Sequence, residues 1–152
     1  GMEAGVSSAA AYSFGGDNDN LSGDYNIIQR LVFSGESTST ISATISDAAF
    51  STAGTYSTTN GYRMGGDAVH GASTIIDRLA FATEVRTTLA AVLTQNYLGA
   101  SGASSSTKGY IAGGAGAVTT RINSLLFSNE TVSIVSSGLS VQRDRRPQGL
   151  RY

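Results

Sequence analysis

The chain has 152 residues, a net charge of -1 and 14% charged side chains, which fits one globular domain and not a charged disordered tail. This nearly neutral charge argues against a general binder of nucleic acid or of anionic membranes, because such proteins concentrate positive charge. The absence of cysteine excludes disulfides and thiolate zinc sites. No apolar run approaches the ~20 residues that span a bilayer as a helix.

The first residues, Gly1-Met2, are interpreted as a tag-cleavage glycine before an initiator methionine. The residues that follow lack the basic and then apolar form of a signal peptide, so secretion by that route is not expected. The localisation of the protein is otherwise left open.

Two short patterns recur three times along the chain and indicate a repeat. The first is an aromatic segment that ends in a double glycine, found at 11–16, 61–66 and 109–114. The second is a phenylalanine with a glutamate three residues after it, found as Phe33/Glu36, Phe81/Glu84 and Phe127/Glu130. The segment between the double glycine and the phenylalanine of the second pattern shortens from repeat to repeat. The segment between that phenylalanine and the tyrosine of the next repeat keeps its length. The variable segment is therefore predicted to be a surface loop.

Each repeat is predicted to contain four short strands. A stretch of small residues (5–8, 54–57 and 102–105) precedes each double-glycine pattern and fits an innermost strand. The second strand ends at the double glycine, and a short apolar run before each phenylalanine gives the third. Apolar side chains with period two predict the fourth strand, at Ile41, Ala43 and Ile45 and then within 89–93 and 135–139. The tyrosines of the first pattern, Tyr12, Tyr62 and Tyr110, are predicted to belong to the core.

Four antiparallel strands repeated every 46 to 50 residues are typical of a β-propeller blade. The double glycine, the variable loop and the aromatic-acidic pair resemble kelch repeats, although the tryptophan usual in their fourth strand is missing. The chain is thus similar to kelch-like or galactose-oxidase-like blades, including those of bacteriophage tail and virion-associated proteins. This resemblance implies an all-β fold with three blades, at about 3–46, 52–94 and 100–140, and raises virion association as one location. It leaves the activity open.

Three blades are fewer than the four to eight that usually close a propeller. We therefore expect a homodimer whose two arcs form a six-bladed ring, with a closing strand at about 147–152. The residues expected at this inter-chain closure are Arg143, Arg145, Arg146, Leu150 and Tyr152. The arginines have a second interpretation, protection of a strand edge against unwanted pairing, and both interpretations stay open.

The candidate ligand-binding residues lie mainly in the variable loops: Asp17, Asp19, Asp24, Tyr25 and His70. The acidic residues loosely resemble a calcium loop, but the ligand set is incomplete, so a polar turn without a metal ion is expected. His70 is the only histidine and is expected to be exposed to solvent. Because no cysteine or second histidine can join it, the copper chemistry of galactose oxidase does not carry over, and no cofactor is expected.

Aromatic residues outside the repeat pattern, Tyr25, Tyr56 and Tyr97, are candidates for a binding surface. The first functional hypothesis is a non-catalytic binding module for a glycan or a surface protein, because variable loops on a constant scaffold diversify recognition. A structural oligomerisation unit is the alternative.

A polysaccharide-active enzyme is the third alternative, and it would need converging carboxylates. The glutamates of the repeat are instead interpreted as hydrogen-bonding groups of their own turn, so no catalytic residue is expected. Arg30 and Arg78 are interpreted as a solvated strand face.

Overall fold

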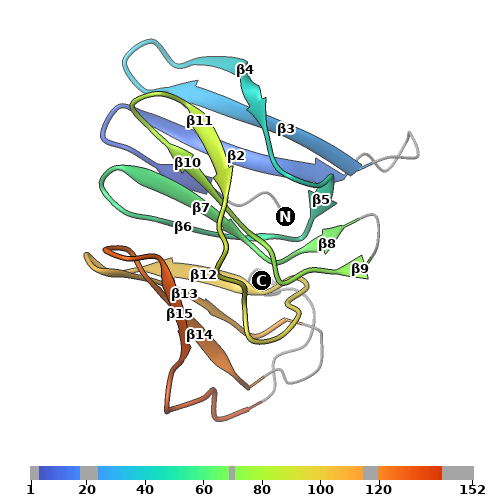
Figure 1. Cartoon of the computed structure of the whole chain (residues 1–152). Helices are drawn as coiled ribbons and strands as arrows, with labels where there is room; N and C mark the ends of the chain where they lie inside the picture. Colours follow the sequence, from blue (N-terminus) through green and yellow to red (C-terminus); the bar gives the residue numbers. More distant parts are fainter. Residues whose placement is uncertain (1–3, 18–23, 69–70, 115–119, 142–152) are drawn as a thin grey trace, which may run out of the picture.

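The computed structural model of the chain describes residues 4–17, 24–68, 71–114 and 120–141. In this part the chain forms three four-stranded antiparallel sheets and one small three-stranded sheet (Figure 1). Sheet 1 contains β1 (Ala4–Val6), β2 (Ala10–Asp17), β3 (Asp24–Val32) and β4 (Ser37–Thr44); sheet 2 contains β6 (Ala53–Tyr56), β7 (Asn60–Met64), β10 (Ile76–Ala80) and β11 (Val85–Thr88); sheet 3 contains β12 (Ser101–Ser104), β13 (Lys108–Ala112), β14 (Ile122–Leu126) and β15 (Thr131–Ile134). The predicted all-β fold with three four-stranded sheets is confirmed.

The small sheet was not predicted. It consists of β5 (Ala49–Phe50), β8 (Asp67–Ala68) and β9 (Gly71–Ala72), in the order β5-β8-β9. It ties the connection between sheets 1 and 2 to the loop that follows the second double glycine. Runs of two residues carry no periodicity, so the sequence offered no signal for these strands.

Each large sheet is a meander in which strands that follow one another in the chain are hydrogen-bonded neighbours. The turn between the first and second strands is held by a serine: the Oγ atom of Ser7 accepts a hydrogen bond from the amide of Ala10 at 2.8 Å. Ser57 and Ser105 hold the corresponding turns of sheets 2 and 3. These turns lie at the same end of the molecule as those between the third and fourth strands, on the left of Figure 1.

The double glycines that follow or end the second strands adopt a left-handed backbone conformation. Their φ angles are all positive, for example 62° at Gly65 and 106° at Gly66, a region that other residues rarely adopt. A Cβ atom added at Gly66 would lie 2.6 Å from Cγ2 of Thr52 and 2.9 Å from the carbonyl oxygen of Phe50. Glycine is therefore required here both for the turn and for the close approach of the neighbouring chain segment.

The three sheets pack face to face in chain order, with two apolar cores between them (Figure 1). The first strands approach the neighbouring sheet closely at glycines: the position of a Cβ atom on Gly61 of β7 lies 3.4 Å from Cα of Gly5 in β1, and the same position on Gly102 of β12 falls against the carbonyl group of Gly54 in β6. The small-residue stretches thus form the first strand of each sheet, where larger side chains would not fit against the neighbouring sheet.

The fourth strand begins earlier than predicted in the second and third repeats. We expected it within 89–93 and 135–139, but β11 and β15 start directly after the preceding turn and end before these segments. The chain bends in both segments, but the amides of Leu89 and Leu93 still donate to the carbonyl oxygens of Ile76 and Thr74. The period-two pattern therefore predicted the burial of Leu89 and Leu93 correctly but not the end of the strand ladder, and in the third repeat Val135 and Leu139 are only partly buried.

Candidate functional site

The contacts between neighbouring sheets use the same recurring side chains. Between sheets 1 and 2, the ring of Tyr12 stacks on Phe81 with the centroids 5.3 Å apart and an interplanar angle of 12°. The hydroxyl group of Tyr12 donates to Oε1 of Glu84 at 3.1 Å, and Nη1 of Arg30 donates to the same oxygen at 2.7 Å. A stacked aromatic pair and a carboxylate that accepts two hydrogen bonds thus join the sheets.

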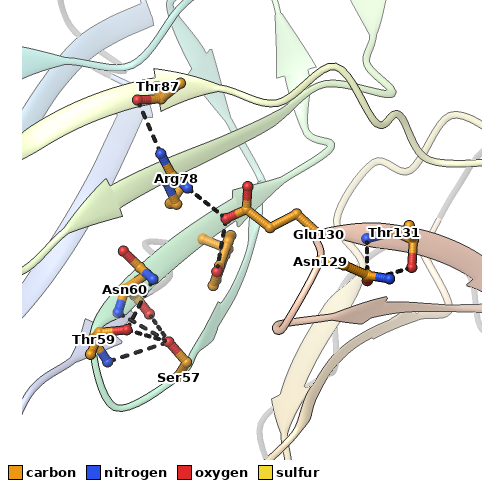
Figure 2. A network of polar contacts seen from close by, with 9 residues as sticks. Ser57, Thr59, Asn60, Arg78, Thr87, Asn129, Glu130 and Thr131 are labelled. Atoms are coloured by element: carbon orange, nitrogen blue, oxygen red, sulfur yellow. Dashed lines mark hydrogen bonds and ion pairs between the residues drawn. The ribbon is translucent and has the colours of Figure 1, made fainter.

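The contact between sheets 2 and 3 repeats this arrangement. Tyr62 stacks on Phe127 at 5.3 Å, and its hydroxyl group donates to Oε1 of Glu130 at 3.2 Å. Figure 2 shows Glu130 extending from its turn in sheet 3 to Arg78 of β10, whose Nη1 donates to Oε1 at 2.9 Å. The landmark residues of the sequence are therefore the residues that attach each sheet to the preceding one.

Two interpretations of these residues were wrong. Arg30 and Arg78 are not simply a solvated strand face, because both are partly buried and form ion pairs with a glutamate of the next sheet. The side chains of Glu84 and Glu130 bond to the preceding sheet and not within their own turns. The sequence placed both arginines on a strand, but it could not show that another sheet covers the face from which they project.

The tyrosines of these contacts are held in their protonated form. Burial, reinforced by the charge of Glu130, raises the pKa of Tyr62 to about 12. Burial and the hydrogen bond to Glu84 also raise the pKa of Tyr12. Since the phenol must carry its proton to donate to a carboxylate, these contacts are complete throughout the neutral pH range.

A second polar contact recurs deeper between the sheets. The amide and hydroxyl groups of Ser46, which follows sheet 1, donate to Oδ2 of Asp77 on β10 at 3.0 and 2.9 Å. The amide and hydroxyl groups of Thr94, which follows sheet 2, donate to Oδ1 of Asn123 on β14 at 2.7 and 3.0 Å. Sheets 2 and 3 therefore each present an acceptor on their third strand to the segment that leaves the preceding sheet.

Arg63 is the most unusual charged residue of the described part of the chain. It is fully buried, and its Nη1 atom lies 3.6 Å from Oδ2 of Asp77, which is also fully buried. Its three guanidinium nitrogens make no hydrogen bond to the described residues. Burial lowers the pKa of Arg63, while the charges of Asp77 and Asp47 act in the opposite direction. No feature of the sequence distinguished this arginine from an exposed one.

The serine-held turns line a cleft of about 610 Å³ where the first strands of the three sheets end. Tyr56, which is 42% exposed, contributes its ring to the lining. The middle residues of the three turns, Ser8, Thr58 and Ser106, add hydroxyl groups that make no hydrogen bond within the described residues. A signal for these turns was present, since a serine lies five residues before each landmark tyrosine.

A smaller cleft of about 380 Å³ lies between sheets 1 and 2 at the same end of the molecule. Tyr12, Arg30, Phe81 and Glu84 are part of its lining. Because these side chains already bond to one another, this cleft belongs to the contact between the sheets.

The structure brings together three of the predicted ligand residues, Asp17, Asp24 and Tyr25, where β2 pairs with β3. Asp17 and Asp24 are paired in the ladder where β2 and β3 meet the first variable loop, and Tyr25 is 41% exposed beside them. Asp19 and His70 lie outside the described residues. Of the aromatic residues outside the repeat pattern, Tyr56 and Tyr25 are exposed as expected.

Tyr97 was wrongly predicted to belong to a binding surface. It is 1% exposed, and its hydroxyl group donates to the carbonyl oxygen of Arg121 at 3.2 Å. This burial raises its pKa to about 12. The residues predicted for inter-chain closure, Arg143, Arg145, Arg146, Leu150 and Tyr152, lie outside the described residues.

Within residues 4–17, 24–68, 71–114 and 120–141, no three histidine, cysteine, aspartate or glutamate side chains gather in a way that could hold a metal ion. The same part of the chain contains no helix that is long and apolar enough to cross a membrane. The chain matches no protein-family model, and no curated protein matches it either.

Proposed function

We propose that the three sheets are kelch-like blades of a β-propeller and that the chain is a non-catalytic binding module for saccharides. Three features support the assignment as blades. The strands of each sheet follow one another in order, the inner strands consist of small residues, and the same contact joins each sheet to the next. This is the arrangement expected of sheets repeated around a central channel.

The observation that carries the binding proposal is the cleft lined by the turns of all three sheets. Its volume of about 610 Å³ is within the range of small-molecule sites. The lining is uncharged: it consists of serine and threonine residues of the three turns together with Val6 and the exposed Tyr56. An aromatic face together with hydroxyl donors and acceptors suits a neutral polyhydroxylated ligand. The resemblance to repeats of virion-associated proteins agrees with recognition of a surface glycan.

The carboxylates of the repeat favour binding over catalysis. Glycoside hydrolysis needs two carboxylates that flank the scissile bond. Glu84 and Glu130 instead accept hydrogen bonds from a tyrosine and an arginine of the preceding sheet. The described lining of the larger cleft contains no carboxylate and no imidazole.

A glycan array followed by calorimetry with the best saccharide tests this proposal. Tyr56→Ala should weaken binding about tenfold, because it removes the stacking surface at a cost of about 1.4 kcal/mol. Tyr25→Ala is the matched control, since its side chain is equally exposed at the opposite end of sheet 1. Absence of binding to any saccharide would contradict the proposal. Loss of binding with Tyr25→Ala alone would show that the ligand binds at the variable loops and not in this cleft.

The second candidate function is a structural oligomerisation unit. It is favoured by one observation: sheet 2 packs against a sheet on both of its faces, whereas sheets 1 and 3 each pack against sheet 2 alone among the described residues. In this part of the chain, sheets 1 and 3 therefore each keep one face that no other described sheet covers.

A further inference from the structure

We infer that the free faces of sheets 1 and 3 are the two halves of one interface, which a second copy of the chain completes head to tail. This inference rests on the assignment of the sheets as blades but not on saccharide recognition. It specifies which residues meet across the interface.

The two contacts inside the chain show what each half contains. The leading half carries a tyrosine on the second strand and a serine or threonine after the fourth strand, as Tyr12 with Ser46 in sheet 1 and Tyr62 with Thr94 in sheet 2. The receiving half carries an acceptor on the third strand and a phenylalanine and a glutamate in the following turn. Asp77, Phe81 and Glu84 form this half in sheet 2, and Asn123, Phe127 and Glu130 form it in sheet 3.

Sheet 1 carries a receiving half that has no partner among the described residues. Gln29, Phe33 and Glu36 occupy the positions of Asp77, Phe81 and Glu84. Phe33 is 44% exposed, and Glu36 has the same positive φ as its counterparts, 46° against 53° at Glu84. The turn is therefore already in the conformation that presents the glutamate to a preceding sheet.

The neighbouring leucine shows that this face is an uncovered interface. Leu31 is 37% exposed, whereas Leu79 and Leu125 at the same position are 0% and 1% exposed because the preceding sheet covers them. Covering Leu31 and Phe33 would remove apolar surface from water at about 25 cal/mol per Å². An uncovered core position is the feature that a binding partner of matching shape would use.

Sheet 3 carries the matching leading half. Tyr110 occupies the position of Tyr12 and Tyr62, and the exposed Ser140 occupies that of Ser46 and Thr94. Applied to a second copy, the internal pattern places Phe33 on the ring of Tyr110, Glu36 as acceptor of its hydroxyl group, and Gln29 as acceptor from Ser140. A head-to-tail contact of this kind closes into a ring when its rotation suits the number of sheets, and two copies supply six.

One part of the internal contact is missing at this interface. Arg30 and Arg78 each pair with the glutamate of the next sheet, but sheet 3 has Ser124 at that position, and its hydroxyl group is hydrogen-bonded with that of Ser133 at 3.1 Å. Glu36 of a second copy would therefore gain a tyrosine hydroxyl group but no described arginine. The contact between copies is thus a weaker version of the contacts inside the chain, and an arginine at position 124 should strengthen it.

Light scattering coupled to size-exclusion chromatography across a dilution series tests the inference. The wild-type chain should elute with twice its mass of 15.6 kDa and dissociate on dilution. Leu31→Glu should give a folded monomer at the concentrations where the wild type is dimeric. Val85→Glu is the matched control and should stay dimeric, because Val85 is an exposed apolar residue on the outer strand of the middle sheet.

Ser124→Arg supplies a test in the opposite direction. It should tighten the dimer roughly fivefold at low salt, and Glu36→Gln in the same chain should remove that gain. A wild-type monomer at tens of micromolar would overturn the inference, as would a dimer that Leu31→Glu leaves intact. A trimer would overturn closure by two copies. None of these outcomes depends on saccharide binding, which is measured separately through Tyr56→Ala.

Discussion

Arg63 and Asp77 can be replaced, singly and together, by the residues at the same positions of the next repeat. The stabilities of these variants distinguish the free-energy cost of an unpaired buried charge from that of a lost polar contact. Both side chains are fully buried, and their charged groups are 3.6 Å apart. At the same positions sheet 3 carries Ile111 and Asn123, which are also buried. The chain therefore contains its own uncharged version of this pair.

The three variants should differ sharply in stability. Asp77→Asn leaves the guanidinium of Arg63 without its buried counter-charge and should cost about 3 kcal/mol. Arg63→Ile should cost about 1 to 2 kcal/mol, because the carboxylate of Asp77 keeps hydrogen bonds from Ser46 and Thr88. The double variant should lie within about 1 kcal/mol of the wild type or be more stable, since a buried ion pair is seldom worth more than a well-packed substitute.

Urea denaturation followed by circular dichroism measures these differences at a fixed protein concentration, which matters if the chain associates. The double-mutant cycle gives the coupling between the two side chains directly. If the double variant loses as much stability as the two single variants together, Arg63 and Asp77 do not compensate each other. The account of the buried pair would then be refuted.

Three further predictions concern the turns and the contacts between sheets. Gly66→Ala should destabilise the fold by about 2 to 3 kcal/mol in thermal unfolding. Gly71→Ala should cost only about 1 kcal/mol, because Gly71 has a similar φ but open space around it. Equal losses would contradict the close approach of Thr52 and Phe50 to Gly66. Because the folded pKa values of Tyr62 and Tyr97 are about 12 against about 10 unfolded, their contribution to stability is complete below pH ~10 and lost as the pH rises through about 12. Ultraviolet titration should accordingly show late tyrosinate formation, and normal titration of all seven tyrosines would disprove it. Glu130→Gln should cost about 1 kcal/mol at low salt and less at high salt, and a loss independent of salt would argue against the ion pair.

The fold was largely accessible from the sequence because its repeat is carried by residues with specific physical roles. The double glycines, such as Gly65-Gly66, recur because the turn requires positive φ. The landmark pairs, such as Tyr62 and Phe127, recur because they meet across every internal contact. Because the same backbone conformation and the same contacts recur, the residues that they require recur at a nearly constant spacing in the sequence. This spacing predicted three four-stranded sheets.

The candidate site was less accessible because its properties depend on which sheet covers which side chain. Arg78 and Arg63 both lie on strands, yet one forms a partly exposed ion pair and the other is fully buried. Tyr97 and Tyr56 both stand outside the repeat pattern, yet only Tyr56 is exposed. Composition and period do not distinguish these cases, because the covering residues are distant in the sequence.

A crystal structure of the full chain tests the central claim, that a second copy completes the contact which each pair of neighbouring sheets makes inside the chain. We expect two copies around a two-fold axis along the channel, with the ring of Phe33 stacked on Tyr110 of the other copy at about the 5.3 Å seen inside the chain. It also predicts that Leu31 becomes buried, as Leu79 is. A crystal in which Phe33 and Tyr110 face solvent in every copy, or contact other surfaces, would contradict it.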